Sequence, residues 1–108
     1  MIEVLVTYKE DKIIEFYAQG HANSAPYGQD LVCSAVSASI TGCFNALNFI
    51  DNYEYTLQEG FALLKTNGHS SYHDEVVLST LVTILATIEA TAPQFIKIDE
   101  NHISENVN

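Results

Sequence analysis

The chain has 108 residues, of which 47% are hydrophobic, and its formal net charge at pH 7 is −10. This length and composition fit a single domain, residues 1–108, with a modest apolar core. With four lysines and no arginine, the chain lacks the basic groups that neutralise phosphates, so direct binding of DNA or RNA is not expected. The acidic balance suits a basic partner, although the same charge also simply keeps a protein in solution.

No feature of the sequence indicates export or a membrane span. Residues 1–4 lack the basic start and apolar segment of a signal peptide, and the uncharged apolar stretch 76–88 is too short to cross a bilayer. The two cysteines, Cys33 and Cys43, would lie about 15 Å apart along one helix, which is too far for a disulfide. We therefore expect a cytoplasmic protein with reduced thiols.

The chain begins with a predicted β-hairpin. Alternating apolar residues indicate strands over 2–8 and 12–19, joined by a polar turn, and the second strand leads to His21. The next segment has no periodic pattern and is rich in turn-forming residues. We expect it to be a loop that covers a bound peptide, although a plain strand-to-helix connection is the alternative. The residues of this loop are Ala22, Asn23, Ser24, Ala25, Pro26, Tyr27, Gly28 and Gln29.

A helix is predicted over residues 31–50, because apolar residues recur there at intervals of three and four. Asp30 can cap its first turn. Cys33 then lies close to the positive end of the helix dipole and to free backbone N–H groups, which favour the thiolate. The same N–H groups can hold an oxyanion. His21, which is twelve residues upstream, can serve Cys33 as base and acid if the loop brings the two together, which spacing alone leaves open.

The second half of the chain predicts a second hairpin, a second helix and a last strand. The hairpin strands cover 53–57 and 61–65. The sequence Ser71-Tyr72-His73-Asp74 resembles a capping box that opens the helix, and Pro93 closes it. A short strand over 95–98 precedes a polar tail, 99–108, which is expected to fray. The order ββαββαβ predicts an α+β fold in which two helices pack on a mostly antiparallel sheet of about five strands.

The segment around Cys33 resembles the signature of the ribosomal-processing cysteine protease family, called Prp. The residues that carry the resemblance are Gly20-His21-Ala22, Gly28, Asp30-Leu31-Val32-Cys33, Ala35-Val36-Ser37 and Asn45-Ala46-Leu47. The chain has Leu31 in place of the usual isoleucine before Val32-Cys33, and Ser34 in place of the usual alanine after Cys33. We expect these differences to affect substrate fit more than chemistry.

The resemblance implies a cysteine endopeptidase that removes the N-terminal extension of a large-subunit ribosomal protein, a step needed for ribosome maturation. It also implies cleavage after an aromatic residue, a homodimer, and catalysis by His21 and Cys33. The alternative is a non-catalytic ribosome-assembly or peptide-binding protein that uses the same groove. No cofactor is expected.

Several residues near the predicted site have more than one interpretation. Without the resemblance, Cys33 would more often be a small buried hydrophobe, and Cys43, on the apolar stripe of the helix, is interpreted as a core residue. Asp30 is a helix cap in the simplest interpretation, and orienting His21 is the sharper one. Ser37 lies one turn beyond Cys33, so its hydroxyl either contacts the site or bonds back to the helix.

A zinc site is the remaining alternative. His69, His73 and Asp74, together with Cys33 or His21, are residue types that bind zinc. However, the two histidines straddle the predicted start of the second helix, so their spacing need not place them on one face. We therefore predict no metal site.

Overall fold

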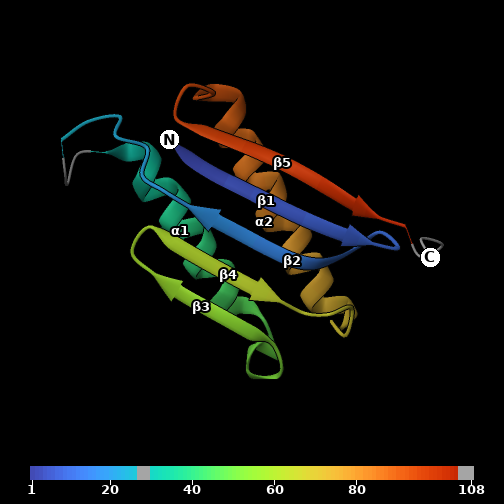
Figure 1. The fold of residues 1–108 in the computed structure, drawn as a ribbon. Helices are drawn as coiled ribbons and strands as arrows, with labels where there is room; N and C mark the ends of the chain where they lie inside the picture. The colour runs from blue at the N-terminus through green and yellow to red at the C-terminus, as the bar shows by residue number, and fades with distance from the viewer. Residues whose placement is uncertain (27–29, 105–108) are drawn as a thin grey trace.

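The structure is a computed structural model, and it describes residues 1–26 and 30–104. Five strands lie in front of two long helices (Figure 1). The elements in chain order are β1 (Ile2–Lys9), β2 (Lys12–Gln19), α1 (Leu31–Ala46), the short 3-10 helix η1 (Ile50–Asn52), β3 (Glu54–Gln58), β4 (Phe61–Lys65), α2 (Tyr72–Thr91) and β5 (Ile96–Ile103). This order confirms the predicted ββαββαβ arrangement.

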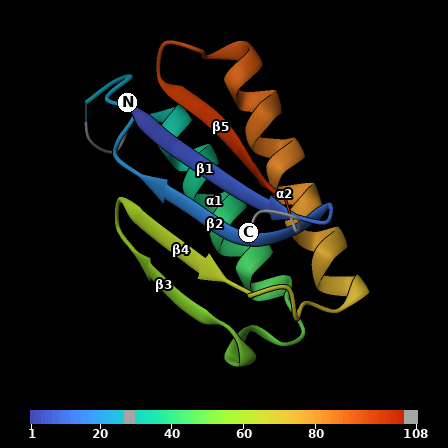
Figure 2. The same cartoon turned by 45° about the vertical axis from the view of Figure 1, so that its right-hand side comes forward.

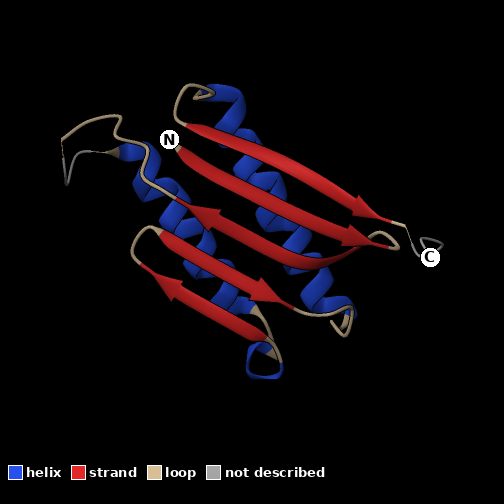
Figure 3. Cartoon of the chain, in the orientation of Figure 1, coloured by secondary structure: helices blue, strands red, loops and turns tan. Residues whose placement is uncertain are grey.

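The five strands form one mixed sheet in the order β3-β4-β2-β1-β5. Strands β1 and β5 run parallel, and the other neighbouring pairs are antiparallel, as the prediction of a mostly antiparallel sheet requires. The parallel pair exists because the connection to β5 passes through α2, which returns the chain to the far edge of the sheet. Both helices cover the same face of the sheet (Figures 2 and 3).

The apolar core lies between this face of the sheet and the helices. The strands contribute alternate residues, because successive side chains of a strand point to opposite faces. The aromatic rings of Phe16 in β2 and Phe44 in α1 meet edge to face, with their centroids 6.1 Å apart. Other fully or nearly fully buried members are Val4, Val6, Val36, Ile40, Leu64, Leu78, Leu81, Leu85 and Ile96.

Helix α1 ends at Ala46, so the prediction that it continues to residue 50 is wrong. The buried carboxylate of Asp74, at the start of α2, accepts hydrogen bonds from the backbone N–H groups of Asn48 at 2.8 Å and Phe49 at 3.3 Å. It also accepts one from the Tyr53 hydroxyl at 2.7 Å. A tertiary contact therefore binds the N–H groups that would have continued α1. The apolar pattern of residues 31–50 could not indicate this contact.

Strand β5 runs to Ile103, so the prediction of a frayed tail from residue 99 is wrong for residues 99–103. These residues pair with β1, from Leu5 opposite Asp99 to Lys9 opposite Ile103. An edge strand is held through its backbone, so exposed polar side chains do not prevent pairing. Residues 105–108 of the predicted tail lie outside the described part of the chain.

Helix α2 begins where the predicted capping box placed it. The Ser71 hydroxyl oxygen accepts a hydrogen bond from the backbone N–H of Asp74 at 3.1 Å, which confirms the cap. The carboxylate of Asp74 accepts the hydrogen bonds from Asn48 and Phe49 instead of one from the backbone of Ser71, as a complete capping box would require. Within residues 1–26 and 30–104, neither helix combines the length and the apolarity that crossing a bilayer demands.

Candidate active site

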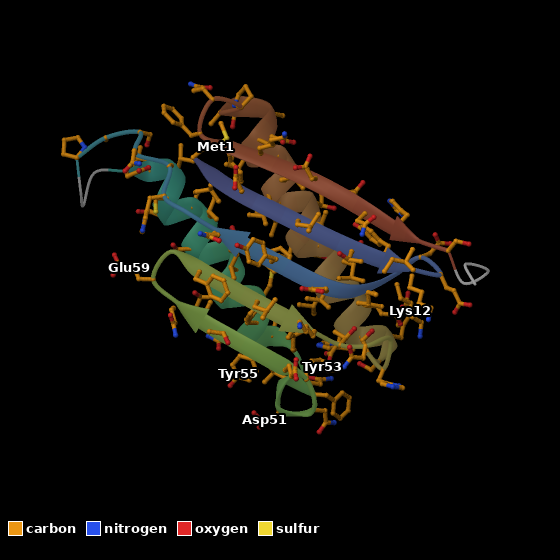
Figure 4. All side chains as sticks on the ribbon, viewed as in Figure 1. Met1, Lys12, Asp51, Tyr53, Tyr55 and Glu59 are labelled. Atoms are coloured by element: carbon orange, nitrogen blue, oxygen red, sulfur yellow. The ribbon has the colours of Figure 1, made fainter. Side chains whose placement is uncertain are left out.

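A cavity of about 780 Å³ opens at the end of the sheet where β2 finishes. Its walls are the N-terminal half of α1, the segment that follows β2, and the turn between β3 and β4. Figure 4 labels Glu59 at that turn, on the same side of the molecule as Met1. The lining residues from the turn and its flanks are Leu57, Gln58, Glu59, Gly60, Phe61 and Ala62, and those from the other walls include His21, Asn23, Ala25, Asp30, Cys33, Ser34 and Ser37.

Cys33 is the third residue of α1 and lines the cavity. Its side chain is partly buried and packs against the apolar core. Its backbone N–H donates to Oδ1 of Asp30 at 2.9 Å. The thiol thus lies in the first turn of α1, at the position that the sequence predicts.

Asp30 is the N-cap of α1, which confirms the simpler of its two interpretations. Besides Cys33, it accepts hydrogen bonds from the hydroxyl of Ser24 and, at 3.0 Å, from the backbone N–H of Ser24. The hydroxyl of Ser24, followed by the N–H of Cys33, holds the pKa of Asp30 below its ordinary value. In the described residues no hydrogen bond joins Asp30 to His21, and its two oxygens tie the loop to the helix.

His21 is exposed, lines the same cavity and lies against the β3–β4 turn. The backbone N–H of Gly20 donates to the carbonyl oxygen of Gly60 at 3.0 Å. A Cβ atom placed on Gly60 would be 2.7 Å from Nε2 of His21. The imidazole therefore rests on the backbone of the turn.

The structure brings His21 and Cys33 to one cavity without joining them. Over residues 1–26 and 30–104, no hydrogen bond links the imidazole to the thiol. Catalytic hydrogen bonds are often long or poorly aligned before substrate binds, so this geometry is compatible with a working pair.

The remaining predicted site residues have different positions. Ser37 is exposed and lines the cavity, as do Asn23 and Ala25 of the predicted loop. Ala22 is buried in the core, so this residue anchors the loop and is not a cavity wall. Pro26 is exposed. Tyr27, Gly28 and Gln29 lie outside the described residues.

The other cysteine and the residues considered for zinc have structural roles. Cys43 packs against the core, and burial raises the pKa of its thiol, which disfavours a nucleophilic thiolate. Nε2 of His73 lies 3.0 Å from the carbonyl oxygen of Ala46, and Asp74 holds the residues after α1. In the part of the chain that the structure describes, no group of three or more His, Cys, Asp or Glu residues is arranged to hold a metal ion.

The β3–β4 turn is the wall that sequence analysis missed. Residues 58–60 join the two predicted hairpin strands, 53–57 and 61–65, but nothing in the local pattern indicates that this turn faces Cys33. The position follows from the strand order, because β4 pairs with β2 and brings Gly60 beside the residues that leave β2. A signal for this wall would have required knowledge of the strand pairing.

The chain is also similar to known proteins. The family model described as "Cysteine protease Prp" matches residues 1–97. The chain belongs to the Prp cysteine protease family. This membership confirms the predicted family and the predicted enzyme class, and it decides against a non-catalytic protein.

Two relatives in this family are named "Ribosomal processing cysteine protease Prp". The Bacillus subtilis protein is 41% identical over 61 residues, which cover 56% of this chain and 54% of that protein. The match thus spans about half the length of the B. subtilis protein. The Staphylococcus aureus protein is 26% identical over 104 residues, which cover 92% of this chain and 98% of that protein.

Solved structures share the fold. Prp from S. aureus, crystallised with a covalently linked product peptide, superimposes with a TM-score of 0.83 at 24% identity, over 94% of this chain and all 100% of that chain. A protein from Streptococcus mutans gives a TM-score of 0.79 at 20% identity, over 95% of this chain and 96% of that chain. The two-helix, five-stranded arrangement is therefore a known fold of this family.

Proposed function

We propose that this protein is an endopeptidase that removes an N-terminal extension from a large-subunit ribosomal protein during ribosome maturation. The observation that carries the proposal is the cavity into which α1 presents Cys33 and the end of β2 presents His21. The relatives from B. subtilis and S. aureus, both named as ribosomal processing proteases, support this substrate class. Residues 1–108 would act as one protease domain.

In the proposed reaction, the thiolate of Cys33 attacks the carbonyl carbon of the scissile bond. The carbon–sulfur bond forms while the carbonyl electron pair moves to oxygen, and the N–H groups at the start of α1 stabilise this oxyanion. Because the N–H of Cys33 already donates to Asp30, we assign this role to Leu31 and Val32. His21 protonates the leaving nitrogen as the peptide bond breaks.

The second half of the reaction restores the enzyme. His21 takes a proton from water, the resulting hydroxide attacks the acyl carbon, and the carbon–sulfur bond breaks to release the thiolate and the peptide acid. Asp30 would support the site by keeping Ser24 and the first turn of α1 together. Ser37, one turn beyond Cys33 in the cavity wall, would contact the bound peptide.

Substrate binding would complete the His21–Cys33 pair. His21 is exposed and rests on the β3–β4 turn, so a bound peptide can shift it toward the thiol. The rate of Cys33 alkylation by iodoacetamide should then change when a non-cleavable substrate peptide that leaves the thiol accessible is bound. An unchanged rate at saturating peptide would contradict this step.

The cavity also supports the proposed specificity. The resemblance to the family implies cleavage after an aromatic residue, and an apolar wall of the cavity suits such a side chain. This wall is formed by Ile2, Ala18, Val36, Ile40 and Ala62. The net charge of −10 supports a basic ribosomal protein as the partner and argues against direct nucleic-acid binding. A cytoplasmic homodimer that acts without a cofactor or a membrane completes the proposal, and the homodimer rests on the family resemblance.

The deciding experiment mixes the protein with the extended ribosomal protein and measures product masses. The parent and the Cys43→Ala variant should release a discrete N-terminal peptide, and the Cys33→Ala variant should leave the substrate intact. Cys43→Ala is the matched control, because both substitutions remove a thiol from the same helix. An intact substrate with all three proteins would contradict the proposal, even if the substrate binds.

A further inference from the structure

We propose that Gly60, in the turn between β3 and β4, is a positioning residue for His21. This inference rests on the proposed function, in which His21 is the acid and base of the reaction. Gly60 would act through the imidazole and would itself take no part in the chemistry. Two independent contacts carry the inference, one from the side chain of His21 and one from the backbone that precedes it.

The first contact is between the imidazole and the backbone of the turn. A Cβ atom on Gly60 would lie 2.7 Å from Nε2 of His21, 3.0 Å from Cε1 and 3.6 Å from Cδ2. Non-bonded heavy atoms are most favourable at roughly 3.5 to 4.0 Å, so any side chain at position 60 would displace the ring. The Nε2 edge of the imidazole thus occupies space that exists because residue 60 is glycine.

The second contact fixes the chain that leads to His21. The N–H of Gly20 donates to the carbonyl oxygen of Gly60 at 3.0 Å, which joins the end of β2 to the turn. The same residue therefore holds the backbone just before His21 and supports its ring. Because β4 pairs with β2 along its length, this support is tied to the sheet.

The catalytic consequence follows from the sensitivity of proton transfer to geometry. His21 and Cys33 line one cavity from different elements, so the distance between them, and the shift that a bound peptide must produce to pair them, depend on where the turn places the ring. A displacement of about 1 Å can reduce a rate by roughly a hundredfold. A side chain at position 60 should therefore affect kcat more than KM.

The test compares two glycines that share a backbone strain but differ in their neighbours. Gly60 has φ +75° and Gly68 has φ +80°, so alanine is strained at both positions. At Gly68, however, the nearest atom to an added Cβ is Cγ2 of Ile14 at 4.0 Å. Gly60→Ala and Gly68→Ala therefore share the backbone strain, and the clash with His21 belongs to Gly60→Ala alone.

A second pair, Gly60→Asn and Gly68→Asn, covers the case in which an alanine variant does not fold. Asparagine tolerates a positive φ better than alanine does, and it still carries a Cβ atom. This pair reduces the backbone strain while it keeps the contact with the imidazole. The folded state of each variant is checked by circular dichroism before kinetics.

Three readouts apply to all variants: kcat and KM for a peptide that spans the cleavage site, the pH profile of Cys33 alkylation, and the Hε1 resonance of His21. In the Gly60 variants we expect kcat to fall by about tenfold to a hundredfold, with a much smaller change in KM. The alkylation profile and the His21 resonance should shift. The Gly68 variants should match the parent in all three. Alkylation of Cys43, measured in the same samples by mass spectrometry, is the internal reference.

The proposal is wrong if Gly60 and Gly68 variants lose kcat equally, because strain alone then explains the loss. It is also wrong if the Gly60 variants keep the parent's kcat, alkylation profile and His21 resonance. Failure of the proposed function is a different result, in which the parent itself does not cleave the peptide. In that case the alkylation profile and the His21 resonance still decide whether Gly60 sets the position of the imidazole.

Discussion

At the scale of single residues, Asp30 determines how the loop and the helix of the site are joined. One carboxylate oxygen accepts from the N–H of Cys33, and both oxygens accept from Ser24. The anion also lies at the positive end of the helix dipole, which favours it further. Cys33 and the segment that follows His21 are therefore held by one ionised group, and the strength of this link depends on pH.

The lowered pKa of Asp30 predicts the direction of that dependence. Because the folded-state pKa lies below the ordinary value of 3.8, the stabilisation is fully present above 3.8 and is lost as the pH falls through the folded-state value. Asp30→Asn keeps a capping oxygen but removes the charge. Urea unfolding between pH 6 and pH 2 should show the parent's advantage over Asp30→Asn at the upper end and its loss at the lower end.

Ser24→Ala is the second variant in this experiment. It removes the hydroxyl that contributes most to the lowered pKa of Asp30, so its stability should depend less on pH than that of the parent. Stability curves that run parallel for all three proteins over the whole range would contradict the role assigned to the Asp30 anion.

At the scale of elements, a buried carboxylate at the start of α2 locks in place the segment that follows α1. Asp74 in the first turn of α2 is fully buried, and it accepts hydrogen bonds from Asn48, Phe49 and Tyr53. This contact ends α1 and starts the path to β3. The β3–β4 hairpin, which forms one wall of the cavity, is thus placed by a contact at the opposite end of α1 from Cys33.

Tyr53→Phe tests this lock with a small change. The substitution removes the hydroxyl that donates to Asp74 at 2.7 Å and keeps the buried ring. Hydrogen bonds to charged groups contribute about 1.5 to 3 kcal/mol, and we expect the free energy of unfolding to fall by that amount in urea titrations. Tyr55→Phe is the matched control, because it removes a hydroxyl from an exposed tyrosine only two residues further along, in β3. It should change the free energy of unfolding little. Equal stability of the two variants would contradict the lock.

The C-terminal half of β5 offers a second test at this scale. A chain that ends after Ile98 loses the pairing of residues 99–103 with β1. Since each net hydrogen bond is worth about 1 kcal/mol, we expect a loss of roughly 2 kcal/mol or more in the free energy of unfolding. A chain that ends after Ser104 keeps the whole strand and should match the parent. If the two truncated chains are equally stable, the outer half of β5 contributes nothing.

At the scale of the whole molecule, the chain carries a large net negative charge. A net charge of −10 in 108 residues creates a field that attracts a basic partner and that salt screens over about 10 Å at 0.1 M. This field acts on the rate of encounter more than on the chemistry of the site. Under the proposed function, this field would therefore affect recognition of the intact substrate and not the cleavage step.

Salt should then separate recognition from chemistry. Raising NaCl from 50 to 500 mM should lower kcat/KM several-fold for an intact basic ribosomal protein, because screening slows encounter. A short neutral peptide that spans the same cleavage site is the control, and its kcat/KM should change little. An equal response of both substrates would show that the charge of the molecule does not guide the partner.

Much of this protein could be predicted from local patterns. The alternation in β1 and β2, the apolar stripe of α1 and the caps at Asp30 and Ser71 each depend on neighbours within a few residues, so the sequence determined the order of the elements. The same locality placed Cys33 in the first turn of α1. The family signature around His21 and Cys33 added the enzyme class.

What only the tertiary structure decided depends on residues far apart in the chain. Asp74 ends α1 from 26 residues away, β1 extends β5 through backbone pairing that needs no apolar side chains, and Gly60 meets His21 because β4 pairs with β2. Such contacts produce no periodic pattern in the sequence, because each depends on a single donor, a single acceptor or the absence of one Cβ atom. The sequence by itself therefore determined the order of the elements and the position of Cys33 in α1, and the packing of those elements decided where they end and what surrounds His21.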